Sequence, residues 1–264
     1  ILLKDLTGHF FIEMIEKLGQ RTAEMHLGLT SIRDDKTFTP ESFSLLYQKS
    51  LNQSFRTLIK KTMTELRSQK NSLQGDVKKM TTRILENENS MLKKIKYSLE
   101  KEKIRSVKTR VHGDYHLGQV LYTGKDFIII DFEGEPARTL SARKLKYCPF
   151  KDVAGMMRSF HYAIFMGYFQ FKNLHEEDHK LFEPWIGHWY HLVTFHFLKA
   201  YLETAGDAPF IPEKKAQIVN LLNVFLVEKS VYELSYEINN RPDWLIIPLN
   251  GLDRIVDNIL IDGQ

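Results

Sequence analysis

The sequence predicts a mainly helical α+β fold in which one small β-hairpin unit is embedded. Apolar residues recur three and four positions apart over most of the 264 residues, which is the spacing of one helix face. Short β-rich runs separated by turn residues occur only in the stretch 107–150. A hydrophobic content of 43% allows a sizeable core, and the length fits one large domain or two small ones.

The first part of the chain, residues 1–106, is expected to be helical. A helix from about Thr7 to Leu29 is followed by the loop "SIRDDKTFTPES", in which Thr39 and Pro40 fit an N-cap and a first helical position. Two long, highly charged helical patterns come next, and we expect an antiparallel hairpin with "SQKNSLQGD" as its turn. Their many lysines are typical of a solvated face. The two patterns cover Glu41 to Lys70 and Leu73 to Lys103.

The stretch 107–150 is expected to hold the strands. The runs "VKTRV", "QVLYT" and "DFIIIDF" are rich in β-branched and aromatic residues, and Thr123–Asp126 between the last two favours a hairpin turn. Helical spacing resumes in the last part, residues 151–264, where the loop "ETAGDAPFIP" separates two helices. The expected helices cover about Lys151–Phe171, Glu177–Thr204, Pro212–Asn239 and Leu249–Leu260.

Charge and composition exclude several classes of protein. The formal net charge of +4, from 37 basic and 33 acidic residues, is too small to favour nucleic acid as a partner. No apolar run approaches the roughly 18 residues of a membrane span, and no signal peptide is recognised, so we expect no membrane contact. The single cysteine, Cys148, excludes an internal disulfide and fits a reducing, cytoplasmic location. Because the chain starts at Ile1, we expect it to be a piece of a longer protein.

The stretch "VHGDYHLGQVL", Val111 to Leu121, carries the most specific pattern of polar residues. Asp114 stands five positions before Gln119 and seventeen before Asp131. The run between Gln119 and Asp131 is expected to form a hairpin, which would bring Asp131 back beside Asp114. A kinase catalytic loop has this layout, with a proton-accepting Asp, an amide five residues later and a second Asp after the next hairpin.

These residue types suit phosphoryl transfer from ATP with Mg²⁺ as cofactor. Mg²⁺ prefers oxygen ligands, which Gln119 and Asp131 offer as an amide and a carboxylate. A hydroxyl that attacks a γ-phosphate needs positioning and a proton acceptor. Asp114 can be that acceptor, because an aspartate with an ordinary pKa of about 3.9 is ionised at neutral pH.

Five separated segments resemble the bacterial maltokinases, which make maltose 1-phosphate from maltose and ATP. They are "LGQRTAEMH", "HGDYHLGQVL", "IIIDFEGEPAR", "KDVAGMMRSFHYA" and "YELSYEINNRPDWLIIPLNGL", and they extend over about residues 18–252. Maltokinases are similar to the aminoglycoside phosphotransferases and are often fused to trehalose synthase. Glutamine at position 119 and "DFEGEP" in place of a plain "DFG" favour the maltokinase branch. The resemblance implies the helical C-terminal lobe of a protein-kinase-like fold, with trehalose synthase, fused or in complex, as a partner.

The resemblance also implies roles for single residues. Asp114 would be the catalytic base, and Gln119 and Asp131 would bind Mg²⁺ and, through it, the nucleotide. Glu133 would assist the metal or orient the sugar. His112 and His116 would support the loop, with Arg138 and Arg143 near the phosphates. The sugar contacts would come from Tyr232, Glu237, Arg241 and Trp244, although Tyr232 and Trp244 also fit core aromatics at a helix end.

Two features complete the expected organisation. No G-x-G occurs among the 14 glycines, and no V-A-I-K-like strand precedes Val107, so the nucleotide lobe of a kinase is missing. We therefore expect residues 1–264 to be a single C-terminal lobe, with the catalytic and metal loops in 107–150 and the substrate-binding part in 151–264. Asp152, at the start of a helix, fits a capping or first-turn charge.

The leading functional prediction is therefore a maltokinase C-terminal lobe, which would use ATP only through the missing N-terminal lobe. One alternative is a kinase for another small alcohol or sugar. A second is a non-catalytic fragment that binds sugar or docks on trehalose synthase. The fragment alone is expected to bind maltose with little or no ATP turnover.

Overall fold

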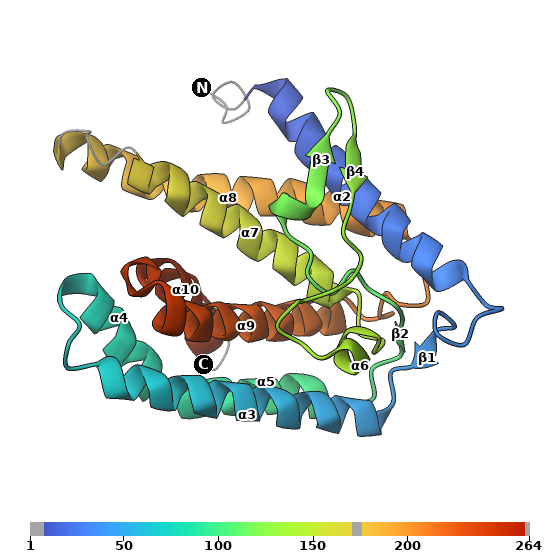
Figure 1. Ribbon diagram of the computed structural model, residues 1–264, viewed down its shortest axis with the longest axis horizontal. Helices are drawn as coiled ribbons and strands as arrows, with labels where there is room; N and C mark the ends of the chain where they lie inside the picture. The colour runs from blue at the N-terminus through green and yellow to red at the C-terminus, as the bar shows by residue number, and fades with distance from the viewer. Residues whose placement is uncertain (1–7, 171–175, 262–264) are drawn as a thin grey trace. The chain divides into compact units, whose positions relative to one another are not determined.

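The computed structural model describes residues 8–170 and 176–261 and has the expected mainly helical fold with small antiparallel sheets (Figure 1). The chain divides into two compact units whose segments alternate along the sequence. The first unit is formed by Ile1–Ser42 and Ser106–Ile211, and the second by Phe43–Arg105 and Pro212–Gln264. That the two units form a single lobe stays a prediction.

Three long helices, α2 (His9–Ser31), α7 (Phe150–Gln170) and α8 (Glu176–Ala205), form the helical part of the first unit. Helix α2 follows the predicted Thr7–Leu29 pattern, and its apolar stripe packs against α8. Gly19 permits this close packing, because a Cβ atom there would collide with the backbone oxygen of Phe197. The core of this unit is largely aromatic and aliphatic, and includes Leu18, Phe160, Phe197 and Tyr201.

Two small antiparallel sheets complete the first unit. Strand β3 (Val120–Tyr122) pairs with β4 (Phe127–Ile129), which confirms the predicted hairpin. Its turn closes through the Thr123 N–H, which donates to the Asp126 carbonyl at 2.9 Å. The second sheet pairs β1 (Glu41–Ser42) with β2 (Val107–Lys108). Strand β1 was not predicted.

The expected helix start at Thr39 and Pro40 is wrong. Helix α3 (Leu45–Gln69) begins later, where the Ser44 hydroxyl accepts a hydrogen bond from the Tyr47 N–H. The preceding residues are extended because Glu41 belongs to β1 and its carboxylate binds Lys108 and Lys146. These tertiary contacts override a local helix-start signal.

The second unit consists of helices and their connections over its described residues. It contains α3, α4 (Gly75–Glu86), α5 (Glu88–Glu100), α9 (Lys215–Asn240), the short helix η2 (Pro242–Trp244) and α10 (Ile246–Ile261). Helix α3 packs against α5, as the predicted antiparallel hairpin requires. The second arm, however, is two helices and not one, because the chain bends at Asn87 (φ −95°, ψ 5°). The Asn87 side-chain amide donates to the Arg83 carbonyl and so caps α4.

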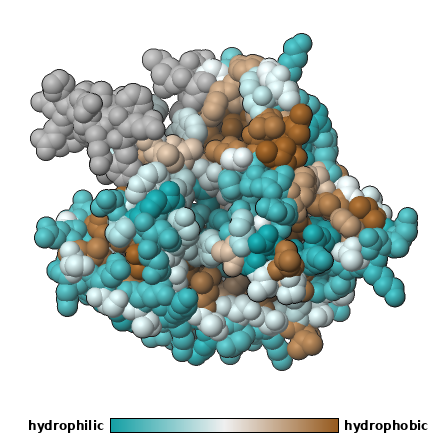
Figure 2. All heavy atoms as spheres, viewed as in Figure 1, coloured by the Kyte–Doolittle hydropathy of each residue, from teal (hydrophilic) through white to brown (hydrophobic). Residues whose placement is uncertain are grey.

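Exposed apolar side chains gather on the β3–β4 hairpin. Figure 2 shows brown, hydrophobic atoms over this part of the first unit, where Leu121, Tyr122 and Ile128 are each about half exposed. Leu121 and Ile128 are cross-strand partners. None of the described helices is long and apolar enough to span a membrane.

Candidate active site

The predicted catalytic loop, residues 111–119, follows β2 in the first unit and ends in the short helix η1 (Leu117–Gln119). Gly113 has a φ of 88°, in the left-handed region that glycine adopts without strain. This turn presents Asp114, whose backbone N–H lies 3.4 Å from His112 Nδ1. Asp114 remains partly exposed, so its carboxylate can meet a substrate.

Asp152 of α7 holds the backbone of this loop. Its two carboxylate oxygens accept the N–H groups of His112 (2.7 Å) and Gly113 (2.9 Å), and the side chain is only 1% exposed. His26 Nε2 lies 3.1 Å from the same carboxylate. Asp152 lies in the first turn of α7, as one of the two expectations had it, but instead of capping this helix its oxygens bind a loop that lies some forty residues earlier in the chain.

The Asp152 carboxylate stays ionised in this buried position. Burial by itself raises the pKa of a carboxyl group. The hydrogen bond and charge of His26, together with the Gly113 N–H, outweigh burial and hold the pKa below its ordinary value. A charged acceptor forms stronger hydrogen bonds to the loop than a neutral one.

His112 connects the catalytic loop to residues 130–134, the predicted metal loop. Its Nε2 donates to the Ile130 carbonyl at 2.8 Å, directly before Asp131, and its ring packs on Phe132. The two loops also meet through backbone, since a Cβ at Gly113 would lie 3.5 Å from the Gly134 Cα. His112 thereby fixes the separation of the two loops.

Gln119 and Asp131 lie side by side at the base of the β3–β4 hairpin, whereas the expected approach of Asp131 to Asp114 stays a prediction. Gln119 Nε2 is 3.0 Å from Asp131 Oδ2, and the Ile130 N–H donates to the Gln119 carbonyl, also at 3.0 Å. Asp131 has a φ of 64°, which is rare for a non-glycine residue and is often found at functional sites. Glu133 is exposed two residues further on.

This pair fits Mg²⁺ better than a transition metal. It offers amide and carboxylate oxygens, and Mg²⁺ commonly uses one or two protein ligands and completes its coordination with substrate phosphates. No group of three or more His, Cys, Asp or Glu in the described parts of the chain could hold a metal ion by itself. An ion at Gln119 and Asp131 would therefore depend on further oxygens from a phosphate.

His116 faces Asp114 from within the same loop. Its Nε2 lies 3.9 Å from Asp114 Oδ2, while its Nδ1 accepts the Gly118 N–H at 3.0 Å. With Nδ1 as an acceptor, a neutral ring carries its proton on Nε2, toward the carboxylate. Gly118 leaves room for the ring, since a Cβ there would lie 2.8 Å from His116 Cε1.

The two arginines near the metal loop have partners within the chain. Arg138 lies over Tyr147 and donates to its hydroxyl at 3.3 Å. Arg143 donates to the carbonyls of Pro136 (2.7 Å) and Arg138 (3.0 Å). Both side chains thus hold the segment that follows Gly134, in which the helix α6 (Leu140–Arg143) lies.

The expected sugar-binding residues belong to the second unit, and three of them form one cluster. Arg241 donates to both carboxylate oxygens of Glu237, at 3.0 and 2.9 Å, and Glu237 is 1% exposed. The Arg241 guanidinium also lies 4.7 Å from the centre of the Trp244 ring. Tyr232 is on the preceding turns of α9, with Lys229 over its ring at 5.3 Å. The cluster and the catalytic loop belong to different units.

Sequence reasoning missed the residues behind the catalytic loop. Thr22, His26 and Ser159 bind Tyr115, Asp152 and the Leu117 N–H, respectively. Thr22 and His26 stand four residues apart on one helix face, which was a readable signal in "LGQRTAEMH". Their partners are about 90 and 126 residues away and could not be inferred from spacing.

The chain matches no protein-family model. Two curated relatives are glucosamine kinases, one from Streptacidiphilus jiangxiensis (26% identical over 154 residues) and one from Mycolicibacterium smegmatis (28% over 150 residues). These alignments cover 58% and 55% of this chain but 32% and 34% of the relatives. The chain thus aligns with about a third of the length of each relative, and the relatives are not maltokinases.

Solved structures of glucosamine kinase are similar over nearly the whole chain. One, in complex with glucosamine, ADP and inorganic phosphate, has a TM-score of 0.76 and 20% sequence identity, and covers 96% of this chain and 57% of its own. Another crystal form has a TM-score of 0.73 and 19% identity, with 94% and 55% covered. At such identities the likeness establishes the fold alone, which is mainly helical with small antiparallel sheets and matches a helical lobe of a kinase-like fold.

Proposed function

We propose that the protein containing this chain is an ATP-dependent sugar kinase, and that this chain is its C-terminal, substrate-binding part. The observation that supports the proposal most strongly is the 3.0 Å pairing of Gln119 with Asp131 beside a loop that carries Asp114. Similarity to glucosamine kinases supports it independently. Because the chain spans only part of these relatives, the activity is proposed for the whole protein.

Asp114 is proposed as the catalytic base. Its carboxylate would accept the proton of the attacking sugar hydroxyl, a step that needs an ionised group held in one place. Asp152 holds the two backbone N–H groups before this residue, His112 accepts the N–H of Asp114 itself, and His116 faces the carboxylate. These contacts limit the movement of Asp114 without covering it.

Gln119 and Asp131 are proposed as ligands of Mg²⁺, with Glu133 close enough to assist. Mg²⁺, when bound, supplies positive charge that offsets the charge of the transferred phosphate. The chain's own contribution is to keep two oxygen-bearing side chains together, through the β3–β4 hairpin and the Ile130–Gln119 backbone bond.

Maltose is proposed as the sugar, with glucosamine as the second candidate. The segment "YELSYEINNRPDW", Tyr232 to Trp244, resembles maltokinases, and it would bind sugar through Tyr232, Arg241 and Trp244. Glu237 already accepts two hydrogen bonds from Arg241, which leaves less capacity for the ammonium group of glucosamine. Glucosamine is favoured instead by the relatives, which are glucosamine kinases.

A non-catalytic role in sugar binding, or in docking on trehalose synthase, is the alternative from another class. A fragment without catalysis has no need of Asp114, Gln119 and Asp131 together, in a hairpin that brings two of them within hydrogen-bond distance. Their presence therefore favours catalysis.

The test is a phosphorylation assay on the purified full-length protein with Mg²⁺-ATP and either maltose or glucosamine, read by mass spectrometry. We expect maltose 1-phosphate, and we expect Asp114→Asn to slow its formation by about 10²- to 10⁴-fold. The matched control is Asp34→Asn, an exposed aspartate in the loop after α2, which should behave as wild type. For residues 1–264 alone we expect maltose binding without appreciable turnover.

Each outcome of this assay is decisive. Product from glucosamine but not from maltose would replace the sugar and keep the reaction class. No transfer to either sugar, with maltose still bound, would favour the non-catalytic alternative. Normal turnover by Asp114→Asn would remove the proposed base.

A further inference from the structure

Helix α2 contacts both the catalytic loop and the β3–β4 hairpin of the proposed active site. The segment "LGQRTAEMH", Leu18–His26, directs Arg21, Thr22 and His26 toward three different parts of the first unit. The proposed function gives none of these side chains a part in the chemistry. Their partners lie in the β3–β4 hairpin, in the catalytic loop and at the start of α7.

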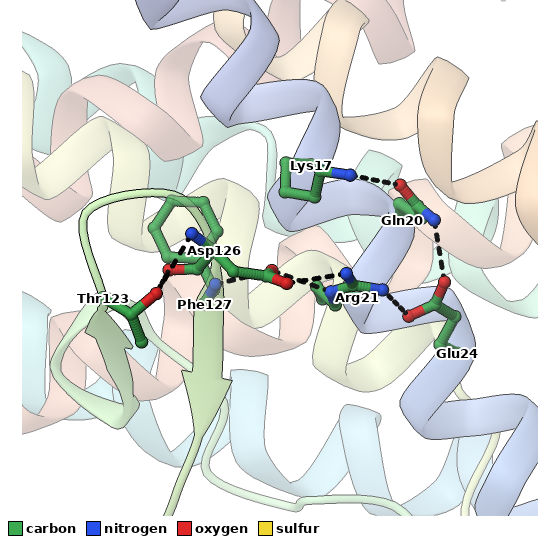
Figure 3. A network of polar contacts seen from close by, with 7 residues as sticks. All are labelled: Lys17, Gln20, Arg21, Glu24, Thr123, Asp126 and Phe127. Atoms are coloured by element: carbon green, nitrogen blue, oxygen red, sulfur yellow. Dashed lines mark hydrogen bonds and ion pairs between the residues drawn. The ribbon is translucent and has the colours of Figure 1, made fainter.

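Arg21 binds the tip of the hairpin that separates Gln119 from Asp131. Its Nε and Nη2 donate to the two carboxylate oxygens of Asp126, at 2.8 and 2.7 Å (Figure 3). Asp126 lies directly before β4, and its N–H and carbonyl both bind Thr123 across the turn. A bidentate pair restrains orientation as well as distance. Arg21 therefore restrains the turn on which the pairing of β3 with β4 depends.

The arginine is itself oriented by its neighbours on α2. Glu24 binds the remaining guanidinium nitrogen, and Gln20 donates to Glu24 at 2.8 Å (Figure 3). Lys17 completes the row by donating to Gln20 at 3.1 Å. The row extends along one side of the helix, so Arg21 has few free rotamers to lose when it binds Asp126.

Thr22 and His26 bind the catalytic loop from the buried side of α2. The Thr22 hydroxyl lies 2.8 Å from the hydroxyl of Tyr115, the residue after Asp114. His26 donates to Asp152, which in turn holds the two N–H groups that precede Asp114, and its other nitrogen faces Tyr201 at 2.9 Å. Thr22 and His26 are both fully buried.

The helix that carries these side chains is fixed against its neighbour. Gly19 lets α2 approach α8 closely, and Ala23, one turn later, is fully buried. His196 of α8 also binds Glu16 of α2 at 2.6 Å. Because α2 is fixed in this way, the side chains that it carries can hold the catalytic loop and the hairpin in defined positions.

We propose that Arg21, Thr22 and His26 are positioning residues that set the place of Asp114 relative to the Gln119–Asp131 pair. Arg21 acts on the metal side through the hairpin, and Thr22 and His26 act on the base side through Tyr115 and Asp152. The proposal rests on the proposed function for its catalytic meaning, but its geometric content is independent of it. Because the two sides are held by different residues, they can be perturbed separately.

The first test uses the full-length kinase and separates Mg²⁺ dependence from turnover. In Arg21→Gln we expect the Mg²⁺ concentration that gives the half-maximal rate to rise about tenfold, because the variant removes an indirect support of a metal ligand. The value of kcat at saturating Mg²⁺ should stay close to that of wild type. In Thr22→Val and Tyr115→Phe we expect kcat to fall about three- to tenfold, the worth of one hydrogen bond, with the Mg²⁺ requirement unchanged.

Two variants control for charge and for side-chain removal. Arg21→Lys keeps the positive charge but loses the bidentate geometry, so it should recover only part of the Mg²⁺ affinity. Arg33→Gln removes an exposed arginine in the loop after α2 and should leave both quantities at wild-type values. If Arg21 had a merely structural role, its variants would lower stability without raising the Mg²⁺ requirement separately from kcat.

The second test is amide hydrogen exchange on residues 1–264 without metal or nucleotide. Arg21→Gln should speed exchange at Ile130, whose N–H closes the hairpin onto Gln119, and leave His112 and Gly113 unchanged. Thr22→Val should speed exchange at His112 and Gly113 and leave exchange at Ile130 unchanged. Equal exchange in wild type and both variants, or equal acceleration everywhere, overturns the positioning proposal.

The two tests distinguish the failure of this proposal from the failure of the proposed function. An active wild type whose Arg21 and Thr22 variants show no split in Mg²⁺ dependence and kcat contradicts positioning alone. A wild type that phosphorylates no sugar contradicts the proposed function, and hydrogen exchange then still decides whether α2 positions the loops.

Discussion

The catalytic loop and the β3–β4 hairpin are held by the same helix in two different ways. The contacts to the catalytic loop are buried, since Asp152, His26 and Thr22 are at most 1% exposed. The contact to the hairpin is partly exposed, with 29% of the Arg21 side chain and 39% of the Asp126 side chain accessible to solvent. The catalytic loop is therefore held by buried contacts, and the hairpin is held by a contact at the protein surface.

This difference predicts different sensitivities. A buried carboxylate that loses its partners is costly, whereas an exposed ion pair is weakened by solvent and salt. Perturbations of the interior should therefore alter the stability of the first unit, and perturbations at the surface should alter mainly the hairpin.

Replacement of Asp152 should have the largest effect on stability. Asp152→Ala leaves the N–H groups of His112 and Gly113 and the ring of His26 without their acceptor in a dry interior. Removal of one partner from such a buried cluster costs about 3–5 kcal/mol. Urea unfolding followed by circular dichroism measures this loss, with Asp34→Ala as an exposed control. A loss below about 1 kcal/mol, the median value of a surface ion pair, would contradict the contrast.

Gly155→Ala should have an intermediate effect, because α7 touches the catalytic loop at this residue. A Cβ there would lie 2.6 Å from the Tyr115 backbone oxygen, so the helix and the loop must separate. Overpacking of this kind costs about 1–3 kcal/mol. The matched control is Gly28→Ala in α2, where no atom lies within 4 Å of the new methyl group and the change should be neutral or stabilising. Equal unfolding midpoints for the two variants would show that the loop tolerates displacement.

The stabilisation that Asp152 provides should depend on pH only under acid conditions. Burial raises its pKa, but His26 and the Gly113 N–H lower it further, so the native pKa is below the unfolded value of about 3.9. Stability from a lowered pKa is fully present above the unfolded value and is lost as pH falls through the native value. The difference in unfolding free energy between wild type and Asp152→Asn should therefore be constant from pH 7 to 5. If the difference in unfolding free energy between the two proteins already becomes smaller between pH 7 and 5, the native pKa of Asp152 is not lowered.

Salt should affect the hairpin and spare the catalytic loop. Raising the ionic strength to 1 M shortens the Debye length to about 3 Å and weakens the partly exposed Arg21–Asp126 pair. Exchange of the Ile130 amide should become faster, and exchange of the His112 and Gly113 amides should not change. Equal responses at the three amides would mean that burial does not distinguish the two loops.

The reactivity of Cys148 gives the smallest signal and reports on the interior as a whole. Its thiol is fully buried, and burial raises its pKa to about 12. Alkylating reagents at pH 8 should therefore label it only as fast as the first unit opens, because the thiolate is the reactive form. Rapid labelling of the native protein would contradict the packed interior behind the catalytic loop.

Much of the fold was predictable because it depends on local signals. Helical periodicity placed α2, α7, α8, α9 and α10 to within a few residues, and the Thr123–Asp126 turn placed the hairpin. The start of α3 and the break at Asn87 were not predicted, since both depend on competition between local signals and particular hydrogen bonds. The alternation of two units along the chain depends on long-range contacts that periodicity does not encode.

In the candidate site, too, features set by local sequence were predictable, and features set by distant segments were not. The hairpin between Gln119 and Asp131 was predictable from its local turn, and the structure places these two side chains together. The roles of Asp114, Gln119 and Asp131 stay predictions. The part played by Asp152 could not be found, because a first-turn aspartate has a common local use as a cap. Its actual partners, His26, His112 and Gly113, come from other segments of the first unit.

The most direct test of the central claim is a Mg²⁺ titration of sugar phosphorylation by the full-length protein, in wild type, Asp114→Asn and Asp131→Asn. If the catalytic loop supplies the base and the hairpin supplies the metal ligands, Asp114→Asn loses turnover at every Mg²⁺ concentration. Asp131→Asn should instead shift the titration to higher Mg²⁺ and recover part of its rate there. A shifted Mg²⁺ requirement in Asp114→Asn, or an unshifted one in Asp131→Asn, would contradict this division of roles.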